Sequence, residues 1–177
     1  SGMGDSRLSN DHLLLAQTPD WDVAPAGVGR SARRAHIAEL LARQRLLSAS
    51  DLREQPGHVW LSQGVAGALG LLCVGEVDGP QARAALIGLK ADDLTRLLGS
   101  DGEPIGTLAN ARQQGWAAPY AALASLDWAA SQSAAQLLDM TAQIRTGQGW
   151  PPLIQGLLGA PSDQVIAQAR QRWGTPQ

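Results

Sequence analysis

One segment near the middle of the chain constrains the fold more than any other. From His58 to Gly75 the sequence is largely apolar, and glycines recur in it at positions 64, 67, 70 and 75. Each glycine costs a helix roughly 1 kcal/mol relative to alanine, so this number of them needs a structural reason. Glycines three residues apart allow a neighbouring backbone to approach closely. The segment is therefore predicted to be the central core helix.

The composition favours helices over strands. Hydrophobic residues make up 44% of the 177 residues, which is enough to fill the core of one domain. The chain has no Phe and only one Tyr, so the large apolar volumes come from Leu and six Trp. Strand-forming residues are scarce, whereas Ala, Leu, Gln and Arg suit helices. We expect an all-α fold, an irregular multi-helix bundle with at most a minor hairpin.

The pattern of turn residues divides the chain into two parts. Residues 1–30 are rich in turn signals and predict a loosely ordered, flexible N-terminal arm. Residues 31–177 predict the helical domain. Its first helix is expected to begin at Ser31, a favourable N-cap, and to run to about Leu47.

Further helices are expected along the rest of the domain. We predict separate helices over 80–89 and 90–98, and then one over 119–126. A longer helix is predicted from Trp128 to about Arg145, with Asp127 as its cap. The Trp150-Pro151-Pro152 segment predicts the start of another short helix, and a last helix is expected after 163.

The apolar stripes of these helices predict the core. Trp60 and Trp128 lie on apolar helix faces and should both be buried. The predicted core residues are Trp60, Leu61, Val65, Leu69, Leu72, Leu86, Leu94, Leu97, Leu137, Leu138 and Ile144.

The residues that carry chemistry do not form a recognisable site. His12, His36 and His58 lack the spacing of metal ligands, and Cys73 lies in an apolar run typical of a small buried side chain. The glycines match neither a dinucleotide-binding nor a phosphate-binding motif. We therefore expect a protein that is not an enzyme, with no catalytic residue, no metal and no cofactor.

Charge and hydropathy narrow the range of partners. The net charge is −2, which steers the chain toward neither nucleic acid nor anionic membrane. No targeting segment and no sufficiently long apolar run are evident, so a soluble, cytoplasmic protein is expected. We expect protein partners, with no nucleic acid, no membrane insertion and no small molecule.

A partner-binding surface is predicted from exposed tryptophan and arginine, which dominate protein interfaces. Trp21, Trp150 and Trp173 lie beside Pro/Gly segments or near the chain end, where complete burial is difficult. Arg33 and Arg34 belong to an arginine cluster on the first helix. That cluster fits either a solvated helix face or a contact with an acidic protein. These five residues form the predicted protein-binding site.

One stretch of the sequence also resembles a known family. It reads His58-Val59-Trp60-Leu61, then Leu69 to Glu76 (LGLLCVGE), Ala82 to Leu86 (ARAAL) and Leu94 to Leu98 (LTRLL). This resembles the SctK/YscK family of type III secretion accessory proteins. The resemblance implies a small, non-catalytic, cytoplasmic bacterial protein of the sorting platform, which links the inner-membrane ring to the cytoplasmic pods.

Two non-catalytic functions are therefore expected from the sequence. The first is an adaptor or assembly protein, in a type III secretion sorting platform and thus in protein transport. The alternative is a secretion chaperone or cytoplasmic regulator that acts by protein binding. Secretion-ring genes beside the coding sequence would favour the first, and an adjacent effector gene would favour the second.

Overall fold

The protein folds into helices, as the composition predicts. The structure, a computed structural model, describes residues 7–9, 12–14, 28–47, 57–99, 118–146 and 150–159, with 164, 167–168 and 171–172. The fold is all-α apart from one short antiparallel hairpin, which pairs β1 (Arg7–Ser9) with β2 (His12–Leu14). This hairpin lies within the predicted N-terminal arm, and most of the arm lies outside the described residues.

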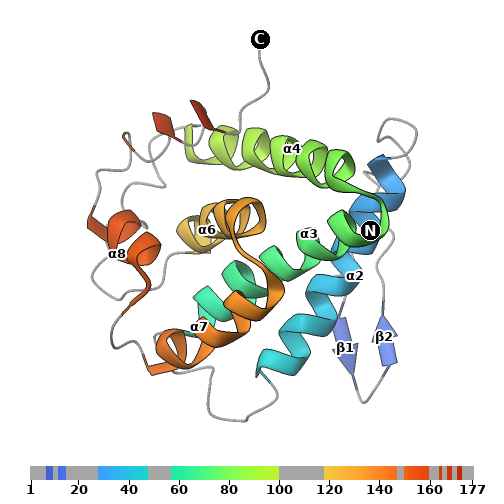
Figure 1. The fold of residues 1–177 in the computed structure, drawn as a ribbon, viewed down its shortest axis with the longest axis horizontal. Coiled ribbons are helices and arrows are strands. Elements are labelled where there is room, and N and C mark those ends of the chain that lie inside the picture. Colours follow the sequence, from blue (N-terminus) through green and yellow to red (C-terminus); the bar gives the residue numbers. More distant parts are fainter. Residues whose placement is uncertain are drawn as a thin grey trace, which may run out of the picture.

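The glycine-rich segment forms the central helix, as predicted. Its first part is a π-helix, η2 (Trp60–Val65), which continues without interruption into α3 (Ala66–Val77). The side chains of Trp60, Leu61 and Val65 are fully buried. The helix ends at Val77, two residues beyond the predicted end at Gly75. Gly79, which follows it, adopts a left-handed conformation with φ of 95°. α3 packs against α2, α4, α6 and α7, which surround it (Figure 1).

Close helix packing explains the glycines of this segment. A Cβ atom added at Gly64 would lie 2.9 Å from the ring of Trp128, and one at Gly67 would lie 3.1 Å from Cβ of Ser125. A Cβ atom added at Gly70 would lie only 2.5 Å from the carbonyl oxygen of Ala35 in α2. The glycines thus admit α6 on one side and α2 on the other.

The neighbouring helices differ from the prediction mainly in where they begin and end. α2 (Val28–Leu47) begins three residues before the expected start. α4 (Pro80–Gly99) is one continuous helix where two were predicted. The predicted break at Lys90 does not occur. Instead Ala91 is fully buried, in line with the buried Leu86 and Ile87, so the packed face continues through that point.

The predicted boundary between the next two helices was also wrong. Asp127, predicted as a cap, lies inside α6 (Ala118–Ser131). The break falls at Ser133, and α7 (Ala134–Thr146) follows it. Ser133 Oγ accepts a hydrogen bond from the backbone N–H of Gln136 at 3.3 Å, and Gln136 Oε1 accepts one from the N–H of Ser133 at 2.8 Å. This reciprocal capping box satisfies two backbone donors that a helix start leaves unpaired.

The last fully described helix begins as expected. α8 (Pro152–Gly159) starts with Pro152 in the first helical position, where the missing N–H of proline costs nothing. It packs against α6 and lies to the left of it in Figure 1.

The core largely matches the predicted set. Leu69 and Leu94 are half-buried, and Leu97 lies outside the residues whose side chains are described. The prediction for Leu138 was wrong, because this side chain is 52% exposed while its neighbour Leu137 is fully buried. Adjacent helical residues point about 100° apart, and α7 buries only one narrow face. The confirmed members are Trp60, Leu61, Val65, Leu72, Leu86, Trp128, Leu137 and Ile144.

The central helix also stands out by its hydropathy. Among the described residues, Trp60–Val77 is the one helical segment long and apolar enough to match a membrane span by length and composition. Within the fold, 61% of this segment is buried inside the protein itself.

Candidate functional site

α2 has two faces of different character. Its inner face buries Ala35, Leu40 and Leu46. Its outer face consists of the exposed residues Arg30, Arg33, Leu41, Gln44 and Arg45. Leu41 is 49% exposed, between arginines toward either end of the helix. The only acidic residue of α2, Glu39, points inward, so the outer face of α2 is basic with an apolar centre.

The two predicted arginines have different environments. Arg33 is exposed, as a partner-binding residue should be. Arg34 instead forms an ion pair with Asp78, in the turn between α3 and α4. Ser31 Oγ donates a hydrogen bond to the other carboxylate oxygen of Asp78 at 2.8 Å. The hydrogen bonds from Ser31 and Arg34 lower the pKa of Asp78 below its ordinary value. Arg34 thus joins α2 to the α3–α4 turn.

The predicted tryptophans are only partly placed by the structure. Trp150 is half-buried, and its ring lies 6.2 Å from that of Trp60 at an angle of 59°. Such a tilted arrangement is favourable for aromatic pairs, so Trp150 contributes to the packing of the core. Trp21 and Trp173 lie outside the described residues. Of the five predicted residues, the structure therefore places Arg33, Arg34 and Trp150.

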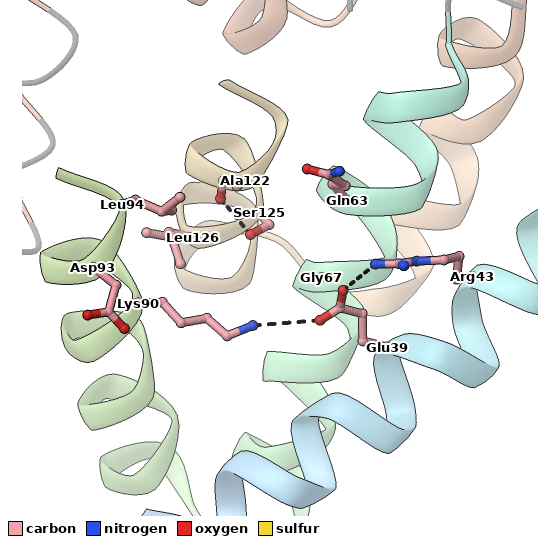
Figure 2. Close-up of a pocket in the computed structure, with 10 residues that line it drawn as sticks. All are labelled: Glu39, Arg43, Gln63, Gly67, Lys90, Asp93, Leu94, Ala122, Ser125 and Leu126. Carbon is pink, nitrogen blue, oxygen red and sulfur yellow. Dashed lines mark hydrogen bonds and ion pairs between the residues drawn. The ribbon is translucent and has the colours of Figure 1, made fainter. Parts of the chain in front are cut away.

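A charged pocket lies on the inner side of α2 (Figure 2). It has a volume of about 280 Å³ and lies between α2, α4 and α6, with Gly67 of α3 in its wall. Arg43 Nη2 donates to Glu39 Oε1 at 2.6 Å, and Arg43 Nε donates to the carbonyl oxygen of Ser62 at 3.0 Å. From α4, the ammonium group of Lys90 lies 3.6 Å from Glu39 Oε2. Glu39 is therefore flanked by a cation on each side.

His36 lies on α2 one turn before Glu39. Burial lowers the pKa of His36 below its ordinary value of 6.5, and the positive charges of Lys90 and Arg43 act in the same direction. The negative charge of Glu39 opposes this effect without overcoming it. Burial thus favours the uncharged imidazole form of His36.

The sequence analysis did not identify this charged pocket. Glu39 and Arg43 are four residues apart on one helix, a spacing that could have indicated their ion pair. Lys90, the only lysine of the chain, is 51 residues away from Glu39, so only the packing of α4 beside α2 reveals its position.

A second hollow lies beside the only cysteine. Its volume is about 490 Å³, and Cys73, Glu76 and Arg83 line one wall of it. The thiol is half-buried rather than fully buried as expected. The aliphatic stem and guanidinium of Arg83 pack over Gly75, where an added Cβ would lie 3.0 Å from Cδ. The residues that line this hollow include no histidine.

One further carboxylate is buried away from both hollows. Asp127 lies in the middle of α6, and Arg172 Nη1 approaches its Oδ1 to 2.7 Å. The two groups form an ion pair without a hydrogen bond, so the charge of Arg172 alone stabilises Oδ1 of Asp127. Arg172 itself is 57% exposed.

No group of three or more His, Cys, Asp or Glu side chains within the described ranges could hold a metal ion. Comparisons with known protein families, with curated proteins and with solved structures find no match to this chain. The outer face of α2 and the charged pocket behind it are therefore the candidate sites, and their function is argued from their own chemistry.

Proposed function

We propose that the protein is a non-catalytic adaptor that binds an acidic surface of a partner protein through the outer face of α2. One observation carries the proposal: Leu41 is half-exposed at the centre of this face, and exposed arginines flank it along the helix. An apolar centre with a charged rim is the usual anatomy of a protein interface.

The two parts of this face would contribute differently to binding. Burying the exposed part of Leu41 would stabilise a complex by about 1 kcal/mol, roughly half the value for a fully buried leucine. The arginines lie at the rim, where charge complementarity mainly raises the association rate and favours partners of opposite charge. The exposed arginines of α2 are Arg30, Arg33 and Arg45, and its only glutamate points inward, so this face favours an acidic partner although the whole chain has a net charge of −2.

The resemblance to the SctK/YscK family supplies a setting for this activity. In that setting the protein is cytoplasmic and bacterial, and its partners are components of a secretion ring or of the cytoplasmic pods. Trp21 and Trp173 stay predicted members of the binding surface. Arg34 and Trp150 are assigned to internal packing instead, because Asp78 and Trp60 already engage them.

The experiment measures binding of candidate ring and pod proteins by surface-immobilised wild type and variants. Arg30→Glu/Arg33→Glu should lower the association rate at least tenfold at low salt, and Leu41→Ser should raise the dissociation rate. Gln81→Glu/Gln136→Glu introduces negative charge on α4 and α7, and Leu138→Ser removes an exposed leucine of α7. These matched controls should bind as the wild type does.

Circular dichroism of each variant confirms that folding is intact. Equal effects of the α2 variants and their matched controls would contradict the proposal, because binding would then not depend on the outer face of α2. A partner whose association rate is independent of salt would contradict the assigned role of the arginines.

A further inference from the structure

We infer that the charged pocket between α2, α4 and α6 is a binding site for a small organic monocarboxylate with a short apolar chain. This goes beyond the proposed function and departs from the expectation that no small molecule binds. The volume of about 280 Å³ lies near the lower limit for small-ligand sites in proteins, which suits a ligand of few atoms.

The charge of the ligand follows from the groups that lack hydrogen bonds. The ammonium of Lys90 lies 3.6 Å from Glu39, close enough for an ion pair but beyond hydrogen-bond distance. The side-chain amide of Gln63 likewise makes no hydrogen bond within the described part of the chain. Figure 2 shows Gln63 projecting from η2 toward α6, and Lys90 reaching from α4 across to α2. Lys90 is thus a cation without a hydrogen bond to Glu39, and Gln63 adds a polar side chain from another helix to the lining of the same pocket.

The guanidinium of Arg43 is not available to bind a ligand. Its guanidinium is held by both Glu39 and the backbone of Ser62, so it shapes the wall of the pocket. Its positive charge also offsets that of Glu39, which keeps the environment of Lys90 from being strongly negative.

The two carboxylates of the pocket limit the charge that a ligand can carry. Glu39 and Asp93 both line it, and both repel an anion. This repulsion grows with the charge of the ligand, so a monoanion is tolerated better than a phosphate dianion. The apolar part of the ligand has Leu94, Leu126 and Ala122 to pack against. A carboxylate group with a short hydrocarbon tail meets all these conditions.

The experiment titrates the full-length protein with hexanoate while amide chemical shifts and the heat of binding are recorded. Saturable binding with a millimolar or lower Kd is expected. Lys90→Ala and Ala122→Leu, which fills the pocket, should each weaken binding at least fivefold. Gln81→Ala and Ala84→Leu, both at exposed positions of α4, are the matched controls and should leave the Kd unchanged.

Inorganic phosphate and hexylamine test the chemical class. Equal or tighter binding of either one would overturn the assignment of a monocarboxylate. Absence of saturable hexanoate binding by the wild type would overturn the site itself, as would unchanged affinity in both folded pocket variants. If Lys90→Ala fails to fold, Gln63→Ala takes its place and the same fivefold loss is required.

Discussion

At the scale of single residues, two ionisable groups make the stability of the fold depend on pH. His36 has a lowered pKa in the folded protein, and so does Asp78. In both cases the unfolded chain binds protons more readily, so stability falls as pH falls. The part due to His36 is fully present above its ordinary pKa of 6.5 and is lost progressively below it. The part due to Asp78 is present above its ordinary value of 3.8 and is lost as pH falls through the lower folded value.

Urea unfolding at a series of pH values measures both effects. The wild type should lose stability in a first step below pH 6.5 and in a second step below pH 3.8. His36→Gln should remove the first step and keep the second, and Asp78→Asn should do the reverse. Stability that increases between pH 6.5 and pH 5 would contradict the assigned state of His36.

Burial of individual leucines gives a second prediction at this scale. Leu72 is 8% exposed in the core, whereas Leu138 is 52% exposed on α7. Leu72→Ala should lower the free energy of unfolding by about 2–5 kcal/mol, because it leaves a cavity and loses apolar burial. Leu138→Ala should change it by less than about 0.5 kcal/mol. Chemical denaturation of the two variants measures these changes. Equal losses of unfolding free energy would contradict the difference in burial between the two positions.

At the scale of helices, the sequence predicted the packed faces better than the joints. The glycine spacing identified the central helix, because close packing leaves a local pattern. The break at Ser133 was missed because Asp127 offered an equally plausible cap, although the capping box of Ser133 and Gln136 is itself a local signal. The helix break predicted at Lys90 was wrong because the burial of Ala91 depends on contacts with distant segments of the chain. This burial shows that the packed face of α4 continues past Lys90.

The candidate sites were predictable only in part, for the same physical reason. The arginine cluster of α2 is local in sequence and was therefore predictable. The internal partners of Arg34 and Trp150 are contacts across 44 and 90 residues, which no local pattern encodes. The charged pocket depends on three helices together and has no local pattern as a whole.

Close helix packing yields a prediction at the same scale. Gly70→Ala would place a Cβ 2.5 Å from the carbonyl oxygen of Ala35, so α2 would have to move away from α3. A loss of about 1–3 kcal/mol in the free energy of unfolding is expected, as for other overpacked cores. Gly156→Ala is the matched control, since nothing lies within 4 Å of its added Cβ in α8. It should be neutral, or stabilising by up to about 1 kcal/mol. A Gly70→Ala protein as stable as the wild type would show that α2 and α3 do not pack this closely.

At the scale of the whole molecule, the central helix makes the described helices one cooperative unit. α3 contacts α2, α4, α6 and α7, while Trp150 joins the start of α8 to Trp60. We expect a single unfolding transition, because no described helix has a core separate from α3. Far-UV circular dichroism and tryptophan fluorescence should therefore give the same urea midpoint. Two midpoints that differ beyond error would indicate an independently folding part.

The order of helices along the chain has a consequence for protein synthesis. The apolar central helix is complete once Val77 has been made, but α6, which covers one side of it, ends 54 residues later at Ser131. At about 5–20 residues per second, a ribosome needs roughly 3–11 s to add those residues. During this interval α2 has already been made, but the side of the segment that α6 covers lacks its partner, although the segment is as apolar as a membrane span. The glycines that admit α6 in the finished protein, Gly64 and Gly67, thus leave one side of the segment exposed until α6 has been translated.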